Sequence, residues 1–489
     1  MKKIILGLLG FTLTAYGVSC KHEPFREPVQ PEVEHGYPEE IARIIVNKCA
    51  TAGCHNEASY EVSGGNLRLD SWSHLFNGGN TGAAVVPYSV ECSPLLYFTN
   101  SFPQHGPIPE DGMKMPLNNP PLSEEEYLTL KNWVLSGAPD KDGNIPFASN
   151  KDTRQKIYLS HLSCDFITVI DAEKHVVMRC IPAGNQVTIE AAYSLKVAPD
   201  GFAYISYWAS QYLFQLDTRT DSISSIIDLG MPNSQTLLPV ANKELLLVNS
   251  FAGAIMRINT ATKQVIQQYG LGQVVSPHGI AANRTRDTFF VTEQSGNIVH
   301  KIAANGWSKK ITIDGQPPSA STGPQPVQIV MSPDFSRYFL SCQATQEVRV
   351  MDAYADTLIR SIPVGQMPQD LAVSRTLPYL FVTCVEDPAT TPIYKGAVYI
   401  IDYNTLEVVR KVNDRYYMPH ALAVDDVYKK LYVFSRNIDP DGPVPHHSSS
   451  TCDGRNGYYS VYDFEKLQPV NNRRYEVTVD PYAADARFK

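Results

Sequence analysis

A segment that recurs about every 45 residues is the feature of this sequence that most constrains its fold. Each copy is a short run of apolar or aromatic residues that ends on or beside Ser, Asn or Thr. Seven copies occur, at residues 157–160, 203–206, 246–249, 289–292, 339–341, 380–383 and 431–433. The ends of the first six copies are 42 to 49 residues apart. Because a period near 45 residues with four strands per repeat is typical of a propeller blade, we predict an all-β, seven-bladed propeller over residues 153–489.

The closure of the ring is also visible in the sequence. A segment that begins with proline opens the inner strand of four repeats, at Pro277, Pro326, Pro368 and Pro419. The first repeat lacks such a segment, whereas residues 481–484 at the C-terminus supply one. We therefore expect the last strand to complete the first blade, which leaves no sheet edge open for aggregation. Residues 349–352, 359–365 and 369–374 resemble the YVTN-type repeat family of seven-bladed propellers, and the resemblance covers most of residues 153–489.

The N-terminus has the pattern of a secretory signal. Lys2 and Lys3 precede an apolar stretch over residues 4–16, and Cys20 follows shortly after it. This ending resembles a bacterial lipoprotein signal, which implies removal of residues 1–19 and diacylation of Cys20. We expect an exported chain that residues 20–36 tether to the bacterial envelope, at the outer membrane, with no membrane contact besides the lipid anchor. An ordinary signal peptide with a coincidental Cys20 is the alternative.

The first folded unit is predicted over residues 37–140, and its chemistry depends on the motif Cys49-Ala-Thr-Ala-Gly-Cys54-His55. Two thiols beside an imidazole, in an exported chain, indicate covalently bound haem. Cys49 and Cys54 would hold the vinyl groups, and His55 would hold the iron. The usual attachment motif has two residues between its cysteines, whereas this one has four. By spacing alone, a Cys49–Cys54 disulfide or a zinc site with His55 is an equal alternative.

The sequence around and after this motif resembles the c-type cytochrome domain named after planctomycetes. The matching blocks follow in the family's order over about a hundred residues, at 64–71, 78–87, 93–96, 113–116, 122–126 and 133–139. The resemblance implies one covalent haem c, with His55 as the proximal iron ligand and Met115 as the distal ligand. Met113 is the alternative distal ligand. A thioether opposite His55 gives a haem of raised potential that is suited to electron transfer.

The helix that ends this unit can be predicted without the resemblance. Ser123 is a favourable N-cap, and Glu126 follows it at the spacing of a capping box. Leu122 and Tyr127 occupy the positions of a hydrophobic staple, and Gly137 lies where a helix ends. We therefore expect a capped helix between Ser123 and Gly137. A linker over residues 141–152 then leads to the propeller.

The remaining cysteines of the exported part have no partner that the sequence identifies. They are Cys92, Cys164, Cys180, Cys342, Cys384 and Cys452. Export places them in an oxidising compartment, where disulfides form and persist. Cys164 and Cys180 flank one strand-turn-strand of the first blade, so a bond between them is one prediction. A buried free thiol is the equal alternative for each.

The inner strands of the propeller predict a candidate ligand site at the mouth of its central channel. Alignment of these strands brings seven side chains to one level: Tyr193, Thr236, His278, Val327, Gln369, His420 and Tyr482. We select His278, His420, Gln369 and Tyr482 as the site, with the two histidines facing each other nearly across the channel. Further groups are expected to open on the same face, namely His161, Tyr207, Glu293, Cys342, Cys384 and the insertions over 385–396 and 436–457. Water bonded to these polar groups is the alternative to a specific ligand.

Composition and missing motifs exclude several classes of function. The chain has 42 Lys and Arg against 50 Asp and Glu, a net charge of -8, and no basic run beyond Lys2 and Lys3. It therefore lacks the phosphate contacts that nucleic-acid binding needs. Since the sequence has no phosphate-binding glycine loop, nucleophile elbow or zinc-protease helix, it does not indicate a hydrolase or a transferase.

The leading prediction is an electron-transfer lipoprotein whose haem exchanges electrons with a redox partner protein in the periplasm or at the cell surface. The propeller would dock that partner or recognise a substrate. The first alternative is a periplasmic oxidoreductase with a second redox centre in the propeller. Cytochrome cd-type nitrite reductases are similar in layout, but they have eight blades where this sequence has seven. The second alternative is a surface lipoprotein whose propeller captures a ligand while the haem is structural.

Overall fold

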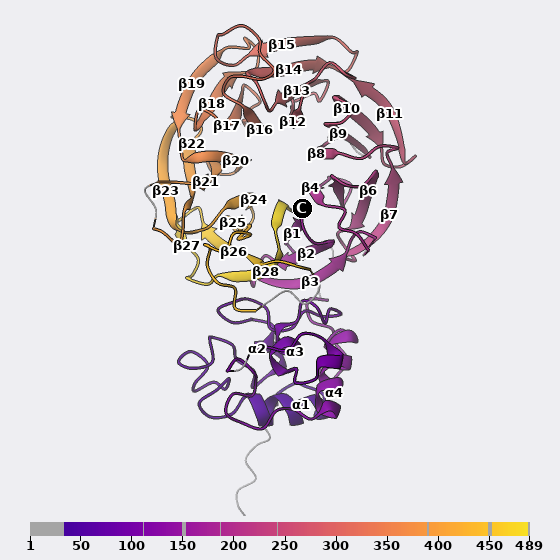
Figure 1. The fold of residues 1–489 in the computed structure, drawn as a ribbon, viewed down its shortest axis with the longest axis vertical. Coiled ribbons are helices and arrows are strands. Elements are labelled where there is room, and N and C mark those ends of the chain that lie inside the picture. The colour runs from indigo at the N-terminus through magenta and orange to yellow at the C-terminus, as the bar shows by residue number, and fades with distance from the viewer. Residues whose placement is uncertain are drawn as a thin grey trace, which may run out of the picture. The chain divides into compact units, whose positions relative to one another are not determined.

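The computed structural model describes residues 34–487 except 111, 149–152, 186, 242, 389–390 and 448–451. The predicted signal segment and the predicted lipidation site at Cys20 lie outside these residues. From His35 onward the chain forms one compact unit that contains a small helical region and a ring of sheets (Figure 1). Within the described part of the chain, no helix is both long enough and apolar enough to cross a membrane.

Seven antiparallel sheets form the predicted seven-bladed propeller, and the innermost strand of each sheet borders the central channel. Blades 1 and 2 consist, from the inside out, of β29 (Pro481–Ala486), β1 (Lys156–His161), β2 (Phe166–Asp171) and β3 (Val176–Pro182), then β4 (Ala192–Val197), β5 (Phe202–Tyr207), β6 (Tyr212–Asp217) and β7 (Ser222–Asp228). Blades 3 and 4 consist of β8 (Ser234–Ala241), β9 (Glu244–Asn249), β10 (Ala254–Asn259) and β11 (Gln264–Tyr269), then β12 (Pro277–Ala282), β13 (Thr288–Glu293), β14 (Ile298–Ala303) and β15 (Ser308–Thr312).

The last three blades follow the same order. They consist of β16 (Pro326–Met331), β17 (Arg337–Cys342), β18 (Glu347–Asp352) and β19 (Leu358–Pro363), then β20 (Gln366–Val373), β21 (Tyr379–Glu386), β22 (Gly396–Asp402) and β23 (Glu407–Tyr416), and finally β24 (Pro419–Asp425), β25 (Lys430–Ser435), β26 (Asn456–Asp463) and β27 (Gln468–Pro469). In blade 7 a further strand, β28 (Tyr475–Val479), also pairs with β26.

The C-terminal strand closes the ring as the sequence predicts. β29 pairs antiparallel with β1, so that Ile157 lies opposite Ala486 and Leu159 lies opposite Ala484. The two ends of the propeller are thereby joined within blade 1, and the inner edge of β1 is paired. The prediction that residues 481–484 supply the missing inner strand is confirmed.

A Ser or Thr near the end of the second strand ties neighbouring blades together in blades 4, 5 and 6, whereas blades 3 and 7 have Val248 and Phe434 at this place. Thr292 Oγ1 accepts a hydrogen bond from Gly279 N at 2.8 Å and donates to Val327 O of the next blade at 2.9 Å. Ser341 and Thr383 make the equivalent pairs of bonds in the two blades that follow. The inner strand is bulged at this point, and the hydroxyl satisfies the backbone group that the bulge frees. The sequence repeat therefore records the contacts that hold the ring together.

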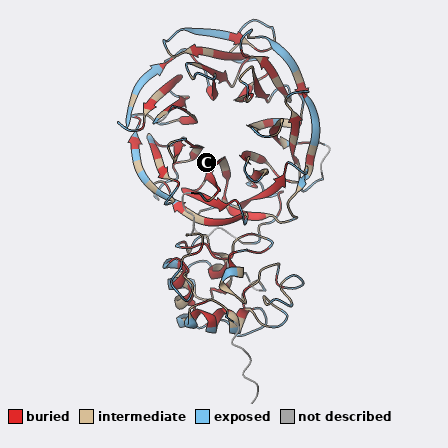
Figure 2. Ribbon diagram, turned by 180° about the vertical axis from the view of Figure 1, so that it is seen from behind, coloured by how far each residue is buried: buried red, intermediate tan, exposed pale blue. Residues whose placement is uncertain are grey.

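Burial follows the position of each strand in its blade. Figure 2 shows that buried residues concentrate on the inner strands, while exposed residues concentrate on the outermost strands. β2 is buried at all six positions, whereas β7 is exposed at four of its seven. The outermost strand of blade 1 is an exception, because Val176 and Val177 of β3 pack in one cluster with Val86 of the helical region.

The helical region lies between residues 39 and 135. It comprises α1 (Glu39–Ile44), the π-helical turn η1 (Ile45–Cys49), α2 (Trp72–Leu75), α3 (Pro94–Thr99), the 3-10 turn η2 (Pro103–His105) and α4 (Glu124–Leu135). α4 begins with the predicted capping box, in which Glu126 N donates to Ser123 Oγ at 3.2 Å and Ser123 N donates to the Glu126 carboxylate at 2.8 Å. Gly137 follows the helix at a φ of 100°, a conformation that favours glycine. The prediction of this helix is confirmed.

Two disulfide bonds are present among the described residues, and they differ from the predicted one. Cys92 pairs with Cys180, and Cys164 pairs with Cys452. The predicted Cys164–Cys180 bond is wrong because the two residues lie at different levels of the blade. Cys164 precedes β2, whereas Cys180 lies inside β3 opposite Thr168.

These bonds connect segments that are far apart in the chain. The first bond ties the helical region to the outermost strand of blade 1, and the second ties blade 1 to the insertion of blade 7. Cys342 and Cys384 are buried free thiols, which is the other outcome that the sequence allowed.

Candidate functional site

His55 is held by three hydrogen bonds that fix both its backbone and its ring. Its N–H donates to Cys49 O at 3.3 Å, and its carbonyl accepts from Leu69 N at 2.8 Å. Its ring atom Nδ1 lies 3.0 Å from Leu67 O. Because a carbonyl oxygen can only accept, Nδ1 carries the hydrogen and Nε2 keeps a lone pair. Nε2 has no hydrogen-bond partner among the described residues, so the imidazole is oriented with one nitrogen available to a ligand.

Residues 64–69 bring the chain back against the motif. A Cβ atom at Gly64 would lie 2.6 Å from Cys54 O and 3.1 Å from His55 Nδ1. Both distances are shorter than ordinary van der Waals contacts, so glycine is required for this approach. Leu67 and Leu69 can then form their bonds to His55. The first block of the resemblance therefore has a physical role at His55 that does not depend on the resemblance.

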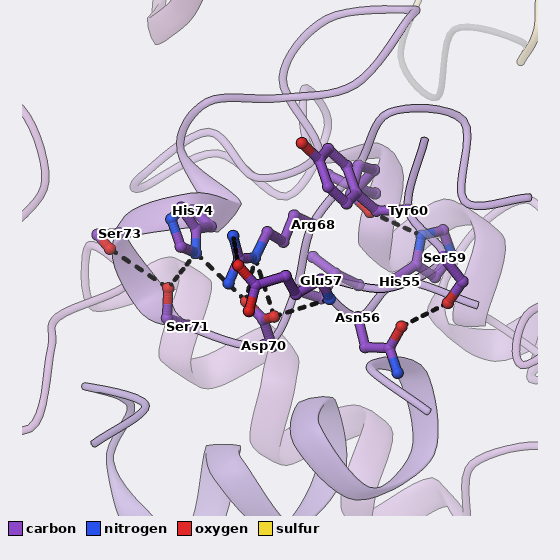
Figure 3. A network of polar contacts seen from close by, with 12 residues as sticks. His55, Asn56, Glu57, Ser59, Tyr60, Arg68, Asp70, Ser71, Ser73 and His74 are labelled. Carbon is purple, nitrogen blue, oxygen red and sulfur yellow. Dashed lines mark hydrogen bonds and ion pairs between the residues drawn. The ribbon is translucent and has the colours of Figure 1, made fainter. Parts of the chain in front are cut away.

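A network of charged side chains fixes the loops around His55 (Figure 3). Asp70 accepts hydrogen bonds from Arg68 Nε at 2.7 Å, from His74 Nδ1 at 3.2 Å and from Glu57 N at 2.9 Å. Burial acts to raise the pKa of Asp70, but the hydrogen bonds from Arg68 and His74 outweigh it, and the pKa is lowered. The carboxylate is therefore charged at neutral pH and joins the segment that follows His55 to the segment that returns to it.

The two thiols of the motif are both free. Cys49 is 6% exposed and belongs to the core of the helical region, whereas Cys54 is partly exposed. Burial, with a contribution from the nearby Cys54, raises the pKa of Cys49 to about 12. The alternative of a Cys49–Cys54 disulfide is therefore not the bonding in the structure. The described residues contain no cluster of three or more His, Cys, Asp or Glu side chains arranged to hold a metal ion.

Met115 and Met113 lie in the loop between η2 and α4, and their backbones are held differently. Met115 N donates to Phe98 O of α3 at 2.8 Å, whereas Met113 N donates to Glu110 O at 3.0 Å, within its own turn. Both side chains are partly exposed. Met115 is thereby attached to the helices of the core.

The seven side chains predicted to share one level line a single cavity of about 910 Å³ on the propeller axis. This volume lies in the range of small-molecule sites. Gln369 lines the cavity, and its backbone carbonyl accepts a hydrogen bond from Ser341 Oγ at 2.8 Å. The side chains at the ends of the second strands were expected to open on the same face, and this expectation is wrong. They are fully buried and do not line the cavity: His161, Tyr207, Glu293, Cys342 and Cys384.

The two predicted histidines are connected through tyrosine rings. His278 Nδ1 donates to Val327 O at 3.0 Å, and His278 Nε2 accepts from the Tyr193 hydroxyl at 2.9 Å. The Tyr193 ring lies 5.0 Å from the Tyr482 ring, which stacks on His420 at 4.1 Å. Burial lowers the pKa of His278 to about 4. At neutral pH this histidine is therefore uncharged, and both of its ring nitrogens are engaged.

His420 is the histidine of this pair that keeps an available nitrogen. Its Nδ1 donates to Tyr482 O at 2.8 Å, and its Nε2 has no hydrogen bond within the described chain. Burial, followed by the charge of Arg436, lowers the pKa of His420 to about 3. Arg436 lies over the Tyr482 ring at 5.1 Å and pairs with Asp480 at 2.5 Å. At the mouth, the neutral His420 imidazole thus keeps a lone pair on Nε2 beside aromatic rings. This lone pair can accept a hydrogen bond or ligate a metal.

A contact that the sequence did not indicate joins the blade 7 insertion to the helical region. The ring of His446 lies 4.8 Å from the ring of Phe98, the residue whose carbonyl holds Met115 N. The carboxylate of Glu476 accepts a hydrogen bond from His446 N at 2.6 Å. The insertion itself was visible as a long segment between two strands of the repeat, but its neighbour was not.

Comparison with known proteins supports the fold and leaves the activity open. No protein-family profile and no curated protein sequence matches the chain. Hydrazine synthase of Kuenenia stuttgartiensis has 15% identity, with 60% of this chain and 88% of that chain covered, at a TM-score of 0.46. A functionally unknown protein from Desulfotomaculum acetoxidans DSM 771 has 14% identity, with 67% and 99% covered, at a TM-score of 0.50. The second likeness is one of fold alone.

Proposed function

We propose that the helical region carries one covalently attached haem c and that the chain is an exported electron-transfer protein. The observation that carries this proposal is the orientation of the His55 ring, whose Nδ1–H points at Leu67 O and whose Nε2 is available. A metal-ligating histidine almost always donates its other ring N–H to a carbonyl or carboxylate oxygen, which fixes its tautomer. Two unpaired thiols, Cys49 and Cys54, lie in the same motif.

The residues of this region fit a haem of the c type. Cys49 and Cys54 would bind its vinyl groups, and His55 and Met115 would bind its iron, which supplies a one-electron couple of raised potential. Four cysteines of the described chain form the disulfides Cys92–Cys180 and Cys164–Cys452. Cys49 and Cys54 remain thiols, although they are close enough for one to affect the pKa of the other. Met115 is preferred to Met113 as the distal ligand because its backbone is bonded to a helix of the core.

Export is supported by the two disulfide bonds, since such bonds persist in oxidising compartments such as the bacterial periplasm. We propose that the protein lies in the periplasm or at the cell surface and is tethered to the envelope through a lipid on Cys20. Its electron source or sink is a redox partner protein in the periplasm or at the cell surface. The propeller docks this partner or recognises a substrate at the channel mouth.

A second redox centre in the propeller is the second candidate function, and one observation favours it. His420 presents a neutral imidazole nitrogen to a cavity of about 910 Å³, which is the arrangement that an axial metal ligand requires. Aromatic rings border this nitrogen, with Tyr482 stacked against His420 at 4.1 Å. In this case the helical region would pass electrons to or from the propeller of the same chain.

Cofactor analysis of the purified full chain, produced in a host with the c-type maturation system, tests the proposal. We expect one haem per chain that is reduced and reoxidised reversibly in a redox titration. His55→Ala should lose the native low-spin spectrum, whereas the control His105→Ala should keep it because the His105 ring bonds to Glu124, outside the network around His55. A wild-type chain without bound haem, or with haem that is not reduced reversibly, contradicts the proposal. A further redox-active group that His420→Ala removes would establish the second candidate.

A further inference from the structure

Contacts between the propeller and the helical region converge on the backbone of Met115. Phe98 O accepts a hydrogen bond from Met115 N at 2.8 Å. The ring of the same Phe98 lies 4.8 Å from the ring of His446 and 6.1 Å from that of His447. Both histidines belong to the insertion between β25 and β26 of blade 7. One residue of α3 therefore connects this propeller insertion to the Met115 loop, with its ring against the insertion and its backbone carbonyl bonded to Met115 N.

Glu476 of β28 holds the two histidines where they meet Phe98. Its side chain is 2% exposed, and a buried carboxylate is costly unless hydrogen bonds or charges satisfy it. Oε1 of the carboxylate accepts from His446 N at 2.6 Å. Oε2 makes no hydrogen bond among the described residues and lies 3.2 Å from His447 Nδ1, with which it forms an ion pair when His447 is protonated. The backbone N–H of Glu476 donates to Thr81 O of the helical region at 2.9 Å. The histidine pair and the helical region are thus attached to the same residue of blade 7.

The insertion is also fixed to the propeller at both of its ends. Near its start, Asn437 Nδ2 donates to Pro443 O at 3.0 Å and to Asn456 O at 2.9 Å. Near its end, Cys452 forms the disulfide with Cys164 of blade 1. These bonds hold the described residues of the insertion to the body of the propeller. The propeller therefore fixes the part of the insertion whose histidine rings contact Phe98.

We propose that this insertion keeps the Met115 loop where its thioether can ligate the haem iron, so that His446 and His447 are positioning residues for the distal ligand. The inference rests on the proposed haem c function. Without the two imidazoles, Phe98 loses ring contacts on one side, and the backbone that holds Met115 N moves more freely. The methionine then gives way more readily to an added iron ligand. Attachment at Cys49 and Cys54 should be unaffected, because no hydrogen bond or ion pair joins them to the described residues of the insertion.

A competition between Met115 and imidazole, measured on the full-length holoprotein, tests this role. Imidazole is titrated into the oxidised protein, and the loss of the sulfur-to-iron absorption gives its apparent Kd. We expect His446→Ala/His447→Ala to bind imidazole roughly two- to tenfold more tightly than wild type, the factor that an aromatic ring contact contributes. Val444→Ala is the matched control, because this side chain of the same insertion is 75% exposed. It should titrate like wild type.

Haem content and the spectrum of the wild-type protein separate the possible failures. If the double variant carries a full complement of haem and titrates like wild type, the positioning role is wrong and the haem c assignment stands. If the wild type holds covalent haem but lacks the sulfur-to-iron absorption, Met115 is not the ligand and the inference fails with it. If the wild type holds no haem, the proposed function itself fails. Phe98→Leu offers a second test that removes the ring and keeps an apolar side chain, and tighter imidazole binding is again expected.

Discussion

Acid should destabilise the propeller, and His161 allows a quantitative test of this prediction. The side chain is fully buried, with Nε2 at 2.9 Å from Thr168 Oγ1 and Nδ1 at 3.2 Å from Val479 O. Burial lowers the pKa of His161 from 6.5 to about 4. The unfolded chain therefore binds a proton that the folded chain excludes. The stability that this group contributes is fully present above pH 6.5 and is lost as the pH falls to about 4.

The size of the effect follows from the two pKa values. The interval between 6.5 and about 4 corresponds to ~3 kcal/mol once the pH is below both values. Between about pH 7 and about pH 5, the same linkage gives a loss of ~2 kcal/mol. The pKa values of His278 and His420 are also lowered by burial, so the whole propeller should lose more than this single contribution.

Urea unfolding of wild type and His161→Gln at about pH 7 and about pH 5 measures this contribution. The glutamine retains hydrogen-bonding groups but cannot bind the proton. We expect the free energy of unfolding to fall by ~2 kcal/mol less in the variant than in wild type over this pH interval. His74→Gln, which changes a partly exposed histidine that pairs with Asp70, is the control. Equal losses in wild type and His161→Gln would refute the reasoning.

Three further changes test other parts of the structure. Gly64→Ala should reduce haem incorporation several-fold relative to Val62→Ala, because the new Cβ would lie 2.6 Å from Cys54 O; equal pigment yields would count against this. Cys92→Ser/Cys180→Ser should lower the free energy of unfolding by about 4–5 kcal/mol, since the bond closes an 88-residue separation; an unchanged denaturation midpoint would be contrary evidence. Met115→His should lower the reduction potential in a redox titration, whereas an unchanged potential would exclude Met115 as the ligand.

The propeller could be predicted because each blade needs the same local contacts. The hydroxyls of Ser341 and Thr383 must reach the next blade, so Ser or Thr recurs at a fixed place in the repeat. The closing strand was predictable for a related reason, since a first blade without an inner strand requires one from elsewhere in the chain. Such local and periodic requirements are written into the sequence at every repeat.

The disulfide pairs and the blade 7 contact could not be predicted because they depend on how distant segments meet. Cys164 and Cys180 are close in sequence, but they lie at different levels of blade 1 and each bonds a distant cysteine. His446 meets Phe98 across more than three hundred residues of chain. Neither contact repeats, so no periodic signal marks it.

The motif at His55 is an intermediate case. Its residues and their possible chemistry were visible in the sequence, but the orientation of the ring was not. The Leu67 carbonyl that fixes the His55 tautomer is a backbone atom, and a backbone contact leaves no residue-specific trace. Gly64 is the exception, since the close approach to Cys54 and His55 demands a residue without a Cβ.

The mass of the denatured full-length protein is the most direct test of the central claim that haem is attached at Cys49 and Cys54. The protein is produced in a host with the c-type maturation system, unfolded, extracted with organic solvent and weighed by mass spectrometry. The account predicts that wild type retains the mass of one haem, and that the retained haem lies on the peptide that contains residues 49–55. Cys49→Ala/Cys54→Ala should lose this mass, whereas Cys342→Ala, which changes a buried free thiol of the propeller, should keep it. A wild-type protein that loses its haem on extraction, or a double variant that keeps it, would contradict the account.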